Sequence, residues 1–284
     1  MVSYRQISPG PATAEFIHCY WFLEGTSCEL ETQRIVPDGR PELIIHVGSP
    51  FEHQQGQTWV SQPECFFVGQ ITGPMLVRPN GAVNTLGIRF HPHGASRLFG
   101  IPLEKLSGKT LPLCELSPEM DRELSRLRDL RTSSLQIAHV DRVLLRFILR
   151  KKQADRITEG AVSQILSSGG VIETSELAFR LGISTRQLQR KFKIEVGIGP
   201  KLLGRIQRFQ RVFAAFESSR DWAQVAVQCG YFDQAHLIRD FHELSGEAPA
   251  ALLTFDTDLA FHFLQSTVKG GAMSEISKTA APSA

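Results

Sequence analysis

Residues 177–200 read L-A-F-R-L-G-I-S-T-R-Q-L-Q-R-K-F-K-I-E-V-G-I-G-P, and residues 225–249 read V-A-V-Q-C-G-Y-F-D-Q-A-H-L-I-R-D-F-H-E-L-S-G-E-A-P. The Leu-Ala pair and the glycine at the start of the first stretch recur 48 residues later as Val-Ala and Gly. The Leu, Phe, Gly and Pro of its second half recur at an offset of 49. One structural unit is therefore present twice, and its register slips by one residue where a turn is expected.

Each copy predicts a helix, a glycine-containing turn, a second helix and a Gly-x-x-Pro exit. The small Ala178 and Ala226 let the second helix cross close to the first, and Gly182 and Gly230 tolerate the positive φ of a tight turn. Ser184 is a favourable N-cap for the second helix of the first copy. The pattern is that of two helix-turn-helix units.

The second helix of the first copy has one apolar and one polar face. Leu188 and Phe192 share a face at 100° per residue and are expected in the core. The opposite face carries arginine, glutamine and lysine, whose side chains suit guanine and adenine edges in the major groove. Residues 174–211 carry nine Lys and Arg against two Asp and Glu, whereas residues 217–247 carry two against six. The positive charge that a polyanion needs is concentrated in the first unit.

Residues 174–251 resemble the DNA-binding domain of the AraC family of bacterial transcription regulators. The resemblance is carried by I-S-T-R-Q-L-Q-R-K-F-K-I-E-V-G-I-G-P at 183–200 and by G-Y-F-D-Q-A-H-L-I-R-D-F at 230–241. It implies a long helix over about 200–216 that joins the units, double-stranded DNA as partner, and RNA polymerase as a further candidate partner. The candidate DNA-binding residues are Thr185, Arg186, Gln189, Arg190, Lys193, Gln234, Ala235, His236 and Arg239. The chain departs from the family in its second unit, where Asp240, His242 and Glu243 replace a more basic surface.

The first 117 residues predict a β-rich domain. Short apolar runs at 16–23, 42–47, 65–68 and 85–90 are separated by Pro- and Gly-containing turns, which favours a sandwich or barrel over βαβ units. V-P-D-G-R-P-E-L-I-I-H at 36–46, F-F-V-G-Q at 66–70 and L-G-I-R-F-H-P-H-G-A at 86–95 resemble a β-barrel sensor-like domain of some AraC-type regulators. The resemblance implies a regulatory domain.

Between these parts, residues 118–156 predict a helical connector. Met120, Leu124, Leu127 and Leu130 recur at helical spacing, a second apolar series follows at 137–149, and Arg142, Arg146 and Arg150 form a basic stripe. This connector caps the β domain or forms a homodimer contact, and the sequence leaves both open.

The expected fold is therefore α+β, with an N-terminal cupin-like β-barrel domain at 1–117, the connector at 118–156, an all-α domain with two helix-turn-helix units at 157–258, and a mostly disordered tail at 259–284. The tail is rich in Gly, Ala, Ser and Thr and lacks a periodic apolar pattern.

For the N-terminal domain we predict a small effector bound by Trp21, His46, Gln70 and Arg89 in the barrel interior. His46, His91 and His93 are the one metal-like constellation, but no ligand-spaced Glu follows and Pro92 ends the strand. We therefore expect no metal and no cofactor. No catalytic motif is present, so a regulator is favoured over an enzyme. The alternatives are a cupin-like metal-dependent enzyme and a DNA-repair alkyl acceptor, the latter requiring a reactive Cys among basic residues.

Composition agrees with this reading. The 42% hydrophobic and 21% charged residues are typical of globular proteins. The five cysteines are scattered and include no C-x-x-C pair, which favours reduced thiols. No apolar run reaches membrane-spanning length and residues 1–16 lack a signal-peptide pattern, so we expect a cytoplasmic protein without a membrane partner.

Overall fold

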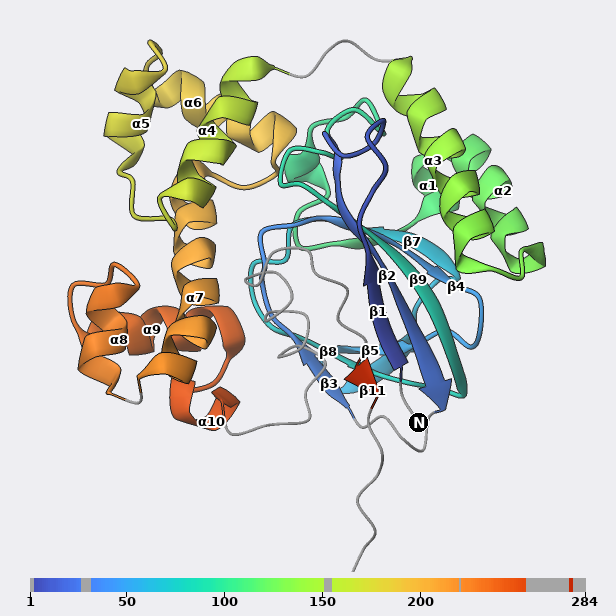
Figure 1. Cartoon of the computed structure of the whole chain (residues 1–284), viewed down its shortest axis with the longest axis horizontal. Coiled ribbons are helices and arrows are strands. Elements are labelled where there is room, and N and C mark those ends of the chain that lie inside the picture. The colour runs from blue at the N-terminus through green and yellow to red at the C-terminus, as the bar shows by residue number, and fades with distance from the viewer. Residues whose placement is uncertain (1–2, 27–31, 151–154, 220, 254–275, 278–284) are drawn as a thin grey trace, which may run out of the picture.

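The computed structural model describes residues 3–26, 32–150, 155–219, 221–253 and 276–277, which form an N-terminal β-sheet domain and a C-terminal helical domain (Figure 1). The strands are β1 (Ser3–Ile7), β2 (Ile17–Thr26), β3 (Gln33–Ile35), β4 (Glu42–His46), β5 (Glu52–Gln55), β6 (Thr58–Ser61), β7 (Cys65–Val68), β8 (Met75–Arg78), β9 (Ala82–Phe90), β10 (Thr110–Pro112) and β11 (Ile276–Ser277). The helices are α1 (Leu113–Leu116), α2 (Pro118–Leu124), α3 (Ser133–Leu149), α4 (Arg156–Ser167), α5 (Thr174–Arg180), α6 (Thr185–Glu195), α7 (Pro200–Ser218), α8 (Trp222–Gln228), α9 (Gln234–Ser245) and α10 (Pro249–Leu253), with 3-10 turns η1 (Leu103–Lys105) and η2 (Ser125–Asp129).

The strands form two sheets and not the closed barrel expected from the sequence. One sheet has seven strands in the order β10-β7-β4-β9-β2-β1-β11, and the other has four in the order β3-β8-β5-β6. Among the described residues, no strand of one sheet pairs with a strand of the other. The four strands of the small sheet are only three or four residues long, so they cover part of the large sheet without closing around it. The expectation of a closed barrel was wrong.

Alternating side chains give the large sheet two buried faces. On one face, Tyr20, Leu43, Ile45 and Ile88 join a core that also takes the buried residues of α1 to α3. On the other face, side chains of β2, β4 and β9 point toward the small sheet, where an apolar cluster includes Trp21. Burial of both faces explains why the predicted strands read as almost continuous apolar runs.

Gly87 leaves room for the Trp21 side chain on the face of the large sheet that points toward the small sheet. It lies opposite Trp21 in the β2–β9 pair, and a methyl group built on it would overlap the Trp21 indole. The absence of a side chain at this position lets the indole lie flat across the neighbouring strand.

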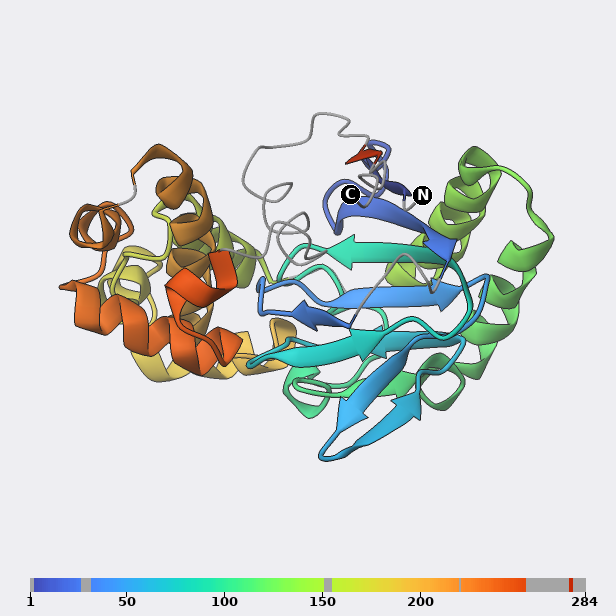
Figure 2. The same cartoon turned by 90° about the horizontal axis from the view of Figure 1, so that it is seen from below.

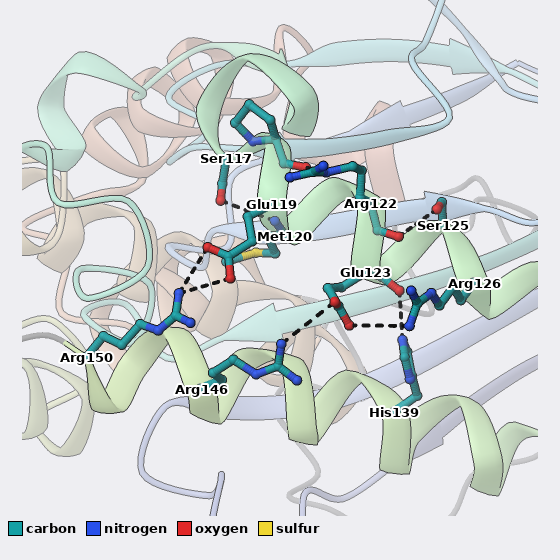
Figure 3. Close-up of polar contacts among 11 residues, drawn as sticks. Ser117, Glu119, Met120, Arg122, Glu123, Ser125, Arg126, His139, Arg146 and Arg150 are labelled. Carbon is teal, nitrogen blue, oxygen red and sulfur yellow. Dashed lines mark hydrogen bonds and ion pairs between the residues drawn. The ribbon is translucent and has the colours of Figure 1, made fainter.

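The helices predicted as a connector pack on the sheet. Met120, Val140, Leu144 and Ile148 are fully buried in the core of the β domain, so capping is one role of these helices. Two arginines of the predicted basic stripe form ion pairs with α2 (Figure 3). Arg146 lies 3.7 Å from the carboxylate of Glu123, and Arg150 lies 3.0 Å from that of Glu119.

The C-terminal helices pack around α7, which lies between the two repeated units (Figure 1). Gly182 and Gly230 end α5 and α8 with φ of 68° and 78°, as predicted. Each turn also contains the same backbone hydrogen bond. Ile183 N–H donates to Ala178 O in the first unit, and Tyr231 N–H donates to Ala226 O in the second. Turns of this kind follow from local sequence alone.

The predicted disordered tail lies outside the described residues, apart from Ile276 and Ser277. These two residues form β11 and pair with Tyr4 and Ser3 of β1, and the expectation of a mostly disordered tail stays a prediction. No helix in the described ranges is long and apolar enough to cross a membrane.

Candidate functional site

The second helix of the first unit, α6, presents a polar surface. Ser184 caps α6 in a capping box with Gln187, whose side-chain oxygen accepts the Ser184 backbone N–H. Leu188 and Phe192 are fully buried against the core. On the outer side Arg186, Gln189, Arg190 and Lys193 are exposed and Thr185 is half-buried. The structure thus gathers the five candidates of the first unit on one helix.

Lys193 differs from its neighbours because its Nζ lies 3.9 Å from Glu104 Oε2 of η1. Nearby, Ser107 Oγ donates a hydrogen bond to Gly197 O at 2.8 Å. The C-terminal end of α6 therefore contacts the β domain, whereas Arg186 at its other end has no acidic partner among the described residues.

The second helix of the second unit, α9, presents fewer charges. Gln234, Ala235 and Arg239 are exposed, and His236 is half-buried with its ring edge-on to Tyr231 at 5.2 Å. The N-cap of α9 is Asp233, which accepts the His236 backbone N–H. The four candidates of this unit again lie on one helix.

Asp240 was read from the sequence as a surface charge, and that reading was wrong. It is only 5% exposed and accepts two hydrogen bonds from Arg205 of α7, from Nε at 3.0 Å and Nη2 at 2.8 Å. Glu243 also pairs with Arg205. These carboxylates join α9 to α7, so they weaken the positive field of the second unit less than the net charge of its segment suggests.

A cavity of about 100 Å³ lies between the two sheets of the β domain. Trp21, His46 and Arg89 line it, but Gln70 does not. Gln70 is buried elsewhere, where its Nε2 donates to Gly39 O at 3.0 Å. The structure therefore brings together three of the four candidate effector residues.

Three charged residues of the cavity, Asp38, Arg40 and Glu42, were not predicted from the sequence. Arg89 Nε lies 2.5 Å from Glu42 Oε1 and 3.4 Å from Asp38 Oδ2, and Glu42 also accepts the Trp21 indole N–H. Burial lowers the pKa of Arg89, but the two carboxylates outweigh this effect and hold it above the ordinary value. Asp38, Arg40 and Glu42 all fall in the segment V-P-D-G-R-P-E, and three charges beside a turn and a buried strand were the available signal.

His46 lies at the same cavity with both ring nitrogens bonded. Its Nδ1 is 2.9 Å from Thr85 Oγ1, and its Nε2 is 3.0 Å from Gln62 Oε1. Burial lowers its pKa to about 4. His91 and His93, the other members of the metal-like constellation, do not line this cavity.

We expect His46 to make stability depend on pH. The unfolded chain takes up a proton on this imidazole near pH 6.5, whereas the folded chain keeps it neutral down to about pH 4. The unfolded state therefore binds more protons between these values, so the free energy of unfolding should fall by up to about 3 kcal/mol as the pH is lowered through this window. The measurement is denaturant unfolding from pH 7 to pH 4 for the wild type and for His46→Gln. The variant should show a shallower decline, and parallel profiles would contradict the assignment.

Comparison with known proteins supports the division into two parts. Residues 177–254 match a family described as a helix-turn-helix domain, and residues 5–112 match a domain of unknown function, DUF6597. No curated protein matches the chain.

Among solved structures, ToxT from Vibrio cholerae O395 is 10% identical, with a TM-score of 0.46 over 90% of this chain and 98% of ToxT. ToxT from strain SCE256 with a bound unsaturated fatty acid is 11% identical, with a TM-score of 0.42 over 90% of this chain and 95% of that one. The AraC-like transcriptional activator CuxR is 14% identical, with a TM-score of 0.25 over 75% of this chain and 86% of CuxR.

Proposed function

We propose that this chain, a DNA-binding transcription regulator of the AraC type, reads DNA with the outer faces of α6 and α9 and is controlled by a small molecule held between its two sheets. The observation that carries the first part is the repeated geometry. In both units the Leu and Phe side chains of the second helix are buried, and its Arg and Gln side chains are exposed.

In the first unit, we assign contacts with base edges to Arg186, Gln189 and Arg190, because Arg and Gln form bidentate bonds with guanine and adenine in the major groove. Thr185 and Lys193, at the two ends of α6, suit phosphate contacts that fix register. In the second unit, we assign base or phosphate contacts to the four candidates on α9, which are Gln234, Ala235, His236 and Arg239.

The joining helix, α7, sets the distance between the two helix-turn-helix units. The 19 residues of α7 make a helix about 28 Å long. The second unit contacts α7 along most of its length, from Arg205, which pairs with Asp240, to Phe216, which stacks on Trp222. One turn of B-DNA is about 34–36 Å. We propose that α7, which packs against both units, holds α6 and α9 toward successive major grooves on one face of the duplex.

Selection of genomic DNA fragments by the purified full chain, followed by footprinting, tests this function. We expect a common sequence with two protected major-groove segments whose centres are about 10 base pairs apart. Binding without sequence preference, or protection of a single groove, would overturn the proposed mode of DNA reading.

For the β domain, the cavity supports effector binding over catalysis. It is largely apolar and contains a few converging polar groups, which is typical of small-molecule sites. We propose that residues 1–117 form the regulatory domain, that 118–156 cap it, and that 157–258 form the DNA-binding domain. Because DNA is the partner, we place the protein in the compartment that holds the DNA, where RNA polymerase is a further candidate partner.

We propose that the exposed surface of α3 binds a second copy of the chain. Leu135, Ala138, Arg142, Leu145 and Leu149 follow one another at alternating spacings of three and four, and Leu135 and Leu149 are 55% and 74% exposed. Such a stripe is typical of helices that pair with another helix.

We expect the wild type to sediment as a dimer and the Leu135→Glu/Leu149→Glu variant as a monomer, since both positions are exposed and the substitutions should leave the fold intact. A wild-type monomer at the same concentration, or a dimeric variant, would contradict this assignment.

A further inference from the structure

Arg40 is a buried arginine, and two of its guanidinium nitrogens have no hydrogen-bond partner among the described residues. It follows a turn in which Gly39 has φ of 77°, and its backbone N–H donates to Asp38 Oδ1 at 2.9 Å. Its side chain lines the cavity and the residue is only 9% exposed. Within the described part of the chain, neither Nε nor Nη1 of Arg40 has a hydrogen-bond partner. A buried charge without a partner strongly destabilises a fold.

The neighbours of Arg40 compensate this charge only in part, because burial lowers the pKa of Arg40 more than the nearby Asp38 carboxylate raises it. The Asp38 and Glu42 carboxylates both pair with Arg89. His18 and His91 are also close to Arg40, but burial lowers the pKa of His18 to about 2 and that of His91 to about 4, so both are neutral at pH 7. The cavity thus contains one arginine, Arg89, that pairs with both carboxylates, and a second, Arg40, for which no ion pair is found among the described residues.

We propose that the guanidinium of Arg40 binds the carboxylate of a small organic monoanion, whose apolar body lies in the cavity between the sheets. This inference rests on the proposed effector function of that cavity and names its ligand class. A carboxylate matches the planar fork of a guanidinium in a bidentate contact. A dianion fits less well, because Asp38 and Glu42 lie beside the same space and would repel a second negative charge.

The remaining lining sets the size and polarity of the ligand body. Most of it is apolar, and Leu23, Ile35, Ile44 and Val77 are examples. A cavity of about 150 Å³ lined by aliphatic side chains accommodates benzene, so a cavity of about 100 Å³ suits a shorter aliphatic chain. Butyrate is therefore a suitable probe, and butyramide is its neutral isostere.

The segment that carries Arg40 also contacts the joining helix. Gln210 Nε2 of α7 donates to Pro37 O at 2.6 Å. Gly39 lies so close to α7 that a methyl group on it would come within 2.8 Å of Leu203 Cδ1. Val36 lines the cavity and is also part of the core of the helical domain. A ligand held by Arg40 therefore acts on residues 36–40, which contact the helix that positions α6 and α9.

The test measures ligand binding and DNA binding separately on the full chain. Butyrate, butyramide and butyl phosphate are titrated while the indole N–H signal of Trp21 is followed by NMR. We expect butyrate to shift this signal and butyramide and butyl phosphate to bind at least tenfold more weakly. Arg40→Gln should weaken butyrate binding at least tenfold and raise the unfolding temperature of the ligand-free chain by several degrees, because it removes a buried charge that its neighbours compensate only in part. Arg78→Gln is the matched control, since Arg78 pairs with Glu52 and does not line the cavity.

The outcomes separate this inference from the proposed function. If butyrate and butyramide bind equally, or if Arg40→Gln lowers the unfolding temperature and leaves butyrate affinity unchanged, Arg40 is not an anion anchor, although the cavity can still hold an effector. If none of the three probes moves the Trp21 signal at millimolar concentration, the ligand class is wrong. Failure of the wild type to bind operator DNA both with and without butyrate would instead count against the proposed mode of DNA reading. Gln210→Leu should retain butyrate binding and lose the change in operator affinity that butyrate causes; an unchanged response would overturn the role of residues 36–40.

Discussion

Replacing both Arg186 and Arg190 by alanine is expected to reduce affinity for operator DNA by at least about thirtyfold at fixed salt, because each bidentate arginine contributes about 1–3 kcal/mol of discrimination between bases. Both side chains are exposed on α6, one turn apart, and neither makes an ion pair with another described residue. Their removal should leave the fold unchanged, since exposed substitutions away from special features change stability by about 0.5 kcal/mol or less. The measurement is a DNA-binding titration with operator and scrambled duplexes.

Arg180→Ala is the control for loss of positive charge alone. Arg180 belongs to α5, pairs with Glu176 and is exposed to a similar degree. We expect it to change operator affinity much less than the double variant. If the double variant weakens operator and scrambled DNA equally, the two arginines contact phosphates and α6 does not read bases.

The same titration compares the two units. Three cations, Arg186, Arg190 and Lys193, are exposed on α6, whereas Arg239 is the cation among the four α9 candidates. We therefore expect Arg190→Ala to weaken binding more than Arg239→Ala. The reason is the set of exposed side chains and not the net charge of each segment, because Asp240 and Glu243 pair with Arg205. Equal losses for the two variants would show that the units contribute equally.

The parts of the structure that the sequence predicted are those fixed by local chemistry. Gly182 and Gly230 adopt positive φ, Ser184 caps α6, and Leu188 is buried on the predicted face. Each of these features depends on residues within one or two turns of helix, so the repeat alone was sufficient to predict them.

The parts that were missed depend on contacts between distant segments. Asp240 pairs with Arg205, 35 residues away, and this contact converts an expected surface charge into a link between helices. Gln70 lies outside the cavity because its amide donates to the turn at Gly39. The two unbonded nitrogens of Arg40 likewise depend on distant contacts, because Arg89 pairs with both nearby carboxylates. Hydrophobic period and turn residues carry no information on such pairings, and they also do not show whether strands close into a barrel.

Phe209→Ala is expected to destabilise both helix-turn-helix units at once, by about 3–5 kcal/mol, which is the range for removing a fully buried phenylalanine. Phe209 lies on α7 and is fully buried. Its ring centroid is 5.2 Å from that of Phe213 and 4.6 Å from that of Phe241 on α9. Because α7 belongs to the core of both units, the cavity left by the substitution weakens the packing that holds α6 and α9 in one arrangement.

The readout is amide hydrogen exchange of α6, α7 and α9, which reports the free energy of local opening without assuming that the whole chain unfolds in one step. Phe232→Ala is the matched control, because this phenylalanine is 90% exposed and its loss should change opening free energies by about 0.5 kcal/mol or less. In Phe209→Ala, protection of α6 and α9 should fall together, and operator affinity should fall with it. Protection lost in α9 alone, with α6 unchanged, would show that the two units are stabilised independently, and α7 would then be a linker and not their shared core.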